Sequence, residues 1–182
     1  MDETMLDVVT GIALPAAAIV ISTLVAVGLA ASERKAAATA RVEERIDAAF
    51  VRALTALAIL NTINLRAESV AEPLRELRVS LTLLEALSTH ADGNLLGEWF
   101  EAERVAGNEQ VAESMRRLQL VPSPLRTDAD VERALAAGGP VNTWARDFAN
   151  RLRDWHRRGA SDDEMRAHIA SARALHPGTS AV

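Results

Sequence analysis

Residues 8–32 read VVTGIALPAAAIVISTLVAVGLAAS and contain no charged side chain. As a helix, these 25 residues extend roughly 37 Å at about 1.5 Å per residue, whereas the hydrocarbon core of a bilayer is about 30 Å thick. Eleven of them are Val, Ile or Leu, which favour the bilayer centre. Pro15 lies early in the run, where neighbouring groups can satisfy the freed carbonyl. The run therefore predicts a transmembrane helix over residues 8–32.

Two alternatives remain open for this run, a cleaved signal peptide and a buried core helix. Gly28 and Ala30 could supply the small residues of a cleavage site. However, the preceding segment carries Asp2, Glu3 and Asp7 and no Lys or Arg, whereas a signal peptide begins with a positive region. The uncharged run is also longer than a signal peptide core, and longer than the 10–14 residues typical of a buried helix.

The flanks of the run predict its orientation. No Lys or Arg precedes it, and Arg34, Lys35 and Arg41 follow it. By the positive-inside rule, these three residues lie at the cytoplasmic membrane interface of a plasma (inner) membrane. Residues 1–7 are then a short extracytoplasmic segment, and the carboxyl-terminal part is cytoplasmic. Lipid is therefore the first expected partner.

Small residues recur every fourth position within the run, at Ala18, Ser22, Ala26 and Ala30. Such a row lines one helix face and lets two helix backbones approach closely, so it is a candidate packing face for another transmembrane helix. The run is rich in Ala, and such a row also arises by chance.

The chain beyond the run has the pattern of an all-α protein. No Gly or Pro occurs between Gly28 and Pro73, so the helix is expected to continue to about Arg66. Residues 33–48 are Ala-rich and predict a helical stalk. Further helices are expected from Pro73, and over 95–118, 131–137, 141–158 and 162–175. Residues 49–176 thus predict a cytosolic bundle of five or six helices, and residues 177–182 a flexible tail.

The strongest helical pattern is that of residues 141–158. One face carries Val141, Trp144, Phe148, Leu152 and Trp155. The other face is polar and includes a basic cluster, Arg151, Arg153, Arg157 and Arg158. This cluster is expected to be the solvated side of a core helix, although contact with lipid remains an alternative.

Helix boundaries are marked by capping residues. Thr127 or Asp128 begins one short helix, and Ser161 with Glu164 forms a capping box for another. Gly107-Asn108 weakens the pattern inside residues 95–118.

The sequence contains few signs of chemistry. Without cysteine, a thiol nucleophile and a cysteine-ligated metal are excluded. His90, His156, His168 and His176 do not form metal-binding pairs, and no nucleotide-binding or nucleophile motif occurs. The net charge of −5 argues against nucleic-acid binding. We therefore expect no enzyme activity, catalytic residue, metal, cofactor or small-molecule ligand.

These features together predict a single-pass, membrane-anchored helical module that binds a protein partner or a second copy of itself. One alternative is an accessory subunit of a multi-subunit membrane complex, for transport or pore formation. A less favoured alternative is a helical enzyme whose acid and base meet only in three dimensions. The terminal Ser180-Ala181-Val182 also resembles a ligand of a peptide-binding domain, although a frayed end is the expectation.

Overall fold

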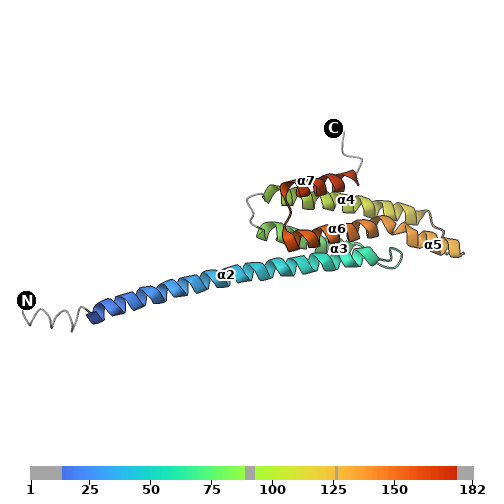
Figure 1. Ribbon diagram of the computed structural model, residues 1–182. Coiled ribbons are helices and arrows are strands. Elements are labelled where there is room, and N and C mark those ends of the chain that lie inside the picture. The colour runs from blue at the N-terminus through green and yellow to red at the C-terminus, as the bar shows by residue number, and fades with distance from the viewer. Residues whose placement is uncertain (1–13, 89–92, 126, 176–182) are drawn as a thin grey trace, which may run out of the picture. The chain divides into compact units, whose positions relative to one another are not determined.

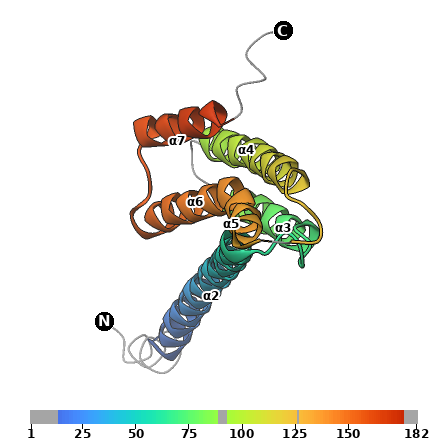
Figure 2. The same cartoon turned by 90° about the vertical axis from the view of Figure 1, so that its right-hand side faces the viewer.

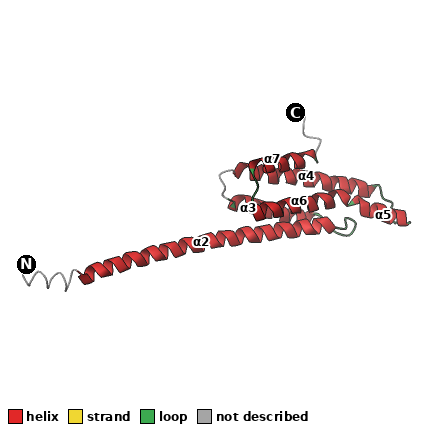
Figure 3. Ribbon diagram, viewed as in Figure 1, coloured by secondary structure: helices red, strands yellow, loops and turns green. Residues whose placement is uncertain are grey.

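The computed structural model describes residues 14–88, 93–125 and 127–175, and for residues 14–25, 27, 28, 31, 93 and 94 it describes the backbone alone. These described residues form helices and no strand, which confirms the all-α prediction (Figures 1 and 3). The helices are α2 (Leu14–Thr62), α3 (Ala71–Leu87), α4 (Gly93–Gln119), α5 (Asp128–Ala137), α6 (Gly139–Arg158) and α7 (Asp162–Ala174).

The chain divides into two compact units, residues 1–44 and 45–182, and the division falls within α2. The expected long helix is observed as α2, but it ends at Thr62 and not near Arg66. Asn64 is the reason. Its carbonyl accepts the amide N–H groups of Ala67 and Glu68, each at 2.9 Å, and its side chain accepts the N–H of Arg66 at 3.1 Å. An Asn side chain that accepts the backbone N–H two residues further on favours a turn over a helix.

The expected transmembrane helix extends beyond the described residues at its amino-terminal end. Residues 8–13 lie outside them, as do the expected extracytoplasmic segment 1–7 and the tail 177–182 with Ser180 and Val182. Within the described part of the chain, no helix combines the length and hydropathy that crossing a membrane requires.

The unit of residues 45–182 is a bundle of stacked helices. α4 and α7 lie side by side, α3 and α6 lie in the next layer, and the part of α2 after Arg45 packs against that layer (Figure 2). α5 lies at one end of the bundle and contacts both α4 and α6.

An apolar stripe at the end of α2 enters the core. Leu57 and Leu60 are fully buried, and Phe50 is half-buried. The Phe50 ring stacks on His156 of α6 with centroids 3.8 Å apart, and Asp47 Oδ1 lies 3.1 Å from His156 Nε2. These two contacts join the end of α2 to α6.

α6 buries the face that its pattern predicts. Val141, Trp144, Phe148 and Leu152 are at most 3% exposed, whereas Trp155 is half-buried. The helix begins at Gly139, two residues earlier than expected, because Pro140 fits the first turn of a helix.

Capping interactions fix the ends of the shorter helices. The capping box predicted at Ser161 of α7 is present, and α5 begins after Thr127, one of its two predicted caps, which also forms a capping box. The backbone N–H of Val141 donates to the buried Ser114 hydroxyl at 3.2 Å, so α4 supplies an acceptor to the first turn of α6.

Candidate functional site

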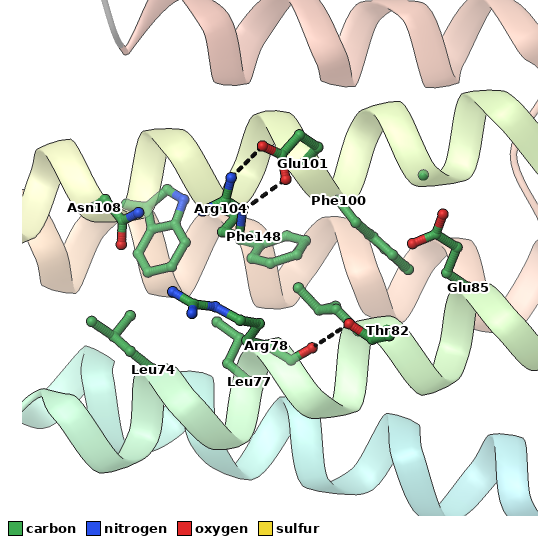
Figure 4. Close-up of a pocket in the computed structure, with 13 residues that line it drawn as sticks. Leu74, Leu77, Arg78, Thr82, Glu85, Phe100, Glu101, Arg104, Asn108 and Phe148 are labelled. Carbon is green, nitrogen blue, oxygen red and sulfur yellow. Dashed lines mark hydrogen bonds and ion pairs between the residues drawn. The ribbon is translucent and has the colours of Figure 1, made fainter.

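A groove lies between α3 and α4, with α6 behind it (Figure 4). We call it the α3–α4 groove. Its cavity volume is about 230 Å³. Six large apolar side chains form its walls, and its remaining lining residues are polar or Gly. The apolar residues are Leu74, Leu77, Leu81, Phe100, Trp144 and Phe148, and the others are Arg78, Thr82, Glu85, Gly97, Glu101, Arg104 and Asn108.

An ion pair occupies the α4 side of this groove. Arg104 Nε donates to Glu101 Oε2 at 2.7 Å, and Arg104 Nη2 donates to the other oxygen, Glu101 Oε1 (Figure 4). The hydrogen bond from Arg104 is the main reason why the pKa of Glu101 lies below its ordinary value, and the charge of Arg78 lowers it further. Both oxygens of Glu101 are therefore engaged.

Two charged side chains of α3 also line the groove. Arg78 extends from α3 toward α4, and Glu85 lies two helical turns further along α3 (Figure 4). Among the described residues, no side chain forms a hydrogen bond or ion pair with the guanidinium of Arg78 or the carboxylate of Glu85. These two groups are available to a molecule in the groove.

Two glycines of α4 bring the helix close to its neighbours. A Cβ on Gly107 would lie 2.4 Å from the Trp144 ring, so only glycine lets this indole pack against the backbone of α4. The predicted weakening at Gly107-Asn108 is therefore not a break, and α4 is continuous through it. A Cβ on Gly97 would lie 2.5 Å from a carboxylate oxygen of Glu85, which is the end of a flexible side chain.

Behind the groove, three side chains surround Glu103, whose side chain is fully buried. Glu103 Oε1 accepts hydrogen bonds from Trp99 Nε1 at 3.0 Å and from Arg151 Nε and Nη2 at 3.1 and 2.7 Å. Glu103 Oε2 accepts one from Trp144 Nε1 at 3.1 Å. We call these residues the Glu103 cluster. Trp144 belongs to both the cluster and the groove.

Opposing effects act on the pKa of Glu103. Burial raises the pKa of this carboxyl above its ordinary value, while Arg151 and the two indole N–H groups lower it. Burial is the largest effect, so the pKa is raised on balance. The cluster links α4 to α6 through a polar network inside an apolar core.

The predicted interface residues lie on α2, in the unit of residues 1–44. The side chains of Arg34, Lys35 and Arg41 are exposed. Of the predicted packing face, Ala26 is exposed and Ala30 is half-buried, while the side chains of Ala18 and Ser22 lie outside the described part. None of these residues is among those that line the α3–α4 groove.

The basic cluster of α6 is paired residue by residue. Arg151 binds Glu103, and Arg153 donates to Asn150 Oδ1 at 2.9 Å. Arg157 and Arg158 form ion pairs with Asp154 and Glu164, at 3.1 and 3.0 Å. One member of the predicted solvated face thus lies largely inside, because the buried carboxylate of α4 requires a cation.

Sequence reasoning missed both the groove and the Glu103 cluster. The available signal for the cluster was the spacing of Trp99 and Glu103, which places an indole N–H and a carboxylate one helical turn apart. In the ranges that the structure covers, no group of three or more His, Asp or Glu side chains could hold a metal ion.

Comparisons of the chain with protein-family models, curated proteins and solved structures returned no match.

Proposed function

We propose that this protein is a non-catalytic, single-pass membrane protein whose cytoplasmic helical bundle binds a protein partner or a second copy of the chain. The support for the anchor is the uncharged run of residues 8–32, followed at once by Arg34 and Lys35. The support for binding is a set of exposed apolar side chains on the surface of the bundle.

The observation that carries the proposal is the path of α2. This helix begins within the uncharged run and ends at Thr62, where Leu57 and Leu60 are part of the bundle core. The folded module is thus built on the same helix as the proposed anchor. Such an arrangement suits a protein that presents a rigid binding surface next to a membrane.

Exposed apolar pairs on two helices support a binding role. Val79 and Leu83 of α3 are 48% and 40% exposed, and Val131 and Leu135 of α5 are 43% and 71% exposed. In each pair the residues are four positions apart, so they lie on one helix face. Apolar residues at this spacing are typical of helix-mediated recognition.

The anchor is tested by extracting membranes with carbonate and centrifuging them. We expect the full-length protein to remain in the pellet. Leu24→Arg places a charge in the middle of the run at a cost of about 2.5 to 3.5 kcal/mol, and should move the protein to the supernatant. Leu24→Ala is the matched control and should stay in the pellet. Wild-type protein in the supernatant would rule out the anchor.

The orientation can be tested with single cysteines, because the chain has none of its own. Thr4→Cys should react with a membrane-impermeant maleimide in intact cells, whereas Ser171→Cys on the exposed surface of α7 should react only after lysis. The opposite pattern would show that the bundle lies outside.

Binding is tested by chemical cross-linking in native membranes. We expect adducts larger than the monomer, and we expect them to be lost in the double variant Val79→Asp/Leu83→Asp or in Val131→Asp/Leu135→Asp. Arg75→Asp, at an exposed position on α3, is the control. A protein that always migrates as an uncross-linked monomer would contradict this function.

The second candidate function is an accessory subunit of a larger membrane complex. It is favoured by the row of small residues Ala18, Ser22, Ala26 and Ala30. Ser22→Leu with Ala26→Leu should then disperse the complex on native gels, with Ile21→Leu as a control. Unchanged migration would remove this candidate.

A further inference from the structure

The α3–α4 groove combines an apolar wall with charged side chains at its rim. Its volume is about 230 Å³, and it is open to solvent. Leu77, Phe100 and Phe148 in its walls are at most 4% exposed. The apolar wall therefore suits the apolar part of an occupant, and the polar lining residues suit a polar end.

The charged side chains of the groove indicate which charge the polar end of an occupant has. Arg78 and Arg104 present two guanidinium groups, and Glu101 presents one carboxylate, whose two oxygens are both engaged by Arg104. Among the described side chains, Arg78 has no hydrogen-bond partner for its guanidinium. This part of the groove has a net charge of +1, counted over these three residues, and favours an anion.

Glu85 does not cancel this preference. It lies seven residues after Arg78 on α3, which is about 10 Å along a helix axis. Its carboxylate lies beside Gly97, at the other end of the groove (Figure 4). An occupant whose polar end lies at Arg78 therefore keeps that end away from the carboxylate of Glu85.

We propose that the α3–α4 groove binds a small monocarboxylate, with its apolar body along the wall that includes Leu74 and its carboxylate paired with Arg78. A guanidinium matches a carboxylate with two parallel hydrogen bonds. The groove runs along α3 from Arg78 to Glu85, about 10 Å along the helix axis, which an extended chain of about eight carbons spans. A chain of about eight carbons is therefore a suitable probe. This site is independent of the membrane anchor and of the protein partner proposed above.

The test uses the full-length protein in lipid nanodiscs and octanoate as the probe, with empty nanodiscs as the blank. Binding is followed by calorimetry and by the tryptophan emission, to which Trp144 in the groove lining contributes. We expect saturable binding of octanoate. The affinity should fall about tenfold or more when octanamide, which lacks the charge, replaces octanoate, and likewise when Arg78→Gln removes the charge from the protein. Arg78→Lys should retain part of the affinity. Arg75→Gln, at an exposed position of α3 that does not line the groove, should bind as the wild type does.

A second variant fills the space without touching the charge. Leu74→Trp adds volume at a half-buried position of the groove wall and should abolish octanoate binding while the helical circular dichroism is unchanged. Three results would overturn the proposal: octanamide binding as tightly as octanoate, Arg78→Gln binding as tightly as the wild type, or octyltrimethylammonium binding more tightly than octanoate. The last result would assign the groove to a cation held by its aromatic rings and Glu85.

Discussion

Arg151 of α6 donates two hydrogen bonds to a single oxygen of Glu103 on α4, at 2.7 and 3.1 Å. The carboxylate is fully buried, and the side chain of Arg151 is 19% exposed. A buried ion pair of this kind adds less to stability than its geometry suggests, because both charges have lost their hydration. Its main effect is to make any other arrangement of α4 and α6 costly.

The first prediction concerns the removal of one member of this pair. Glu103→Leu leaves Arg151 and two indole N–H groups without their acceptor, and should lower the free energy of unfolding by about 3–5 kcal/mol. The measurement is urea denaturation of the full-length protein, followed by tryptophan emission, since all three tryptophans lie in α4 and α6. Glu101→Gln, at an exposed ion pair on the same helix, should cost no more than about 1 kcal/mol. Equal losses in the two variants would contradict the role of burial.

The second prediction concerns acid sensitivity through His168. The centroid of this ring lies 5.2 Å from that of the Trp99 ring. Burial lowers the pKa of His168 below the ordinary value of 6.5. Arg151 and Arg158 lower it further, while Glu164 and Asp154 act in the opposite direction. The folded state thus favours the neutral ring. The contribution of the neutral His168 ring to the free energy of unfolding is fully present above the unfolded-state pKa. It is lost as the pH falls through the lower, folded-state pKa.

His168→Gln should remove this part of the pH dependence. The urea midpoint of the wild type should fall between pH 7.5 and pH 5.5 by more than that of the variant. His156→Gln provides a comparison at the second described histidine of the bundle. If wild type and His168→Gln lose stability in parallel over this range, the burial of His168 has no such effect.

The third prediction compares two glycines of α4. Gly107→Ala forces the Trp144 ring away from the helix and should destabilise the protein by about 1–3 kcal/mol, as overpacking does. Gly97→Ala displaces only the flexible end of Glu85, so the better helix propensity of Ala should make this variant neutral or up to about 1 kcal/mol more stable. Thermal unfolding measures both. A reversed order would show that the Trp144 contact is not tight.

The fourth prediction concerns the cap of α7. Ser161 accepts the N–H of Glu164 at 3.3 Å, and Glu164 accepts the N–H of Ser161 at 2.9 Å. Ser161→Ala should cost about 0.5–2 kcal/mol, and Ser161→Asp should retain most of the stability. Ser171→Ala, at an exposed position later in α7, should change stability by less than about 0.5 kcal/mol. Identical unfolding curves for the two Ala variants would be inconsistent with the capping box.

Much of the fold follows from local pattern. The stripes of α6 and of the end of α2, and the caps at Thr127 and Ser161, depend on residues a few positions apart, and the structure contains all of them. The pattern predicts too late an end for α2, because it does not show that the Asn64 side chain accepts the backbone N–H of Arg66.

The candidate sites follow from contacts between distant residues, which local pattern does not contain. Glu101 and Glu103 are the same residue type two positions apart on α4, yet one is exposed and the other is fully buried. The difference comes from Trp144 and Arg151, which lie 41 and 48 residues further along the chain. The groove likewise requires α3, α4 and α6 to meet, so its volume could not be predicted from any one of them.

The ending of α2 inside the core has a mechanical consequence. A pulling force on the amino-terminal part of this helix passes along its backbone to Leu57 and Leu60, with no intervening loop to absorb it. The apolar contacts of these two leucines and the stack of Phe50 on His156 then carry the load together. Tension on this helix would thus be felt by the folded core itself.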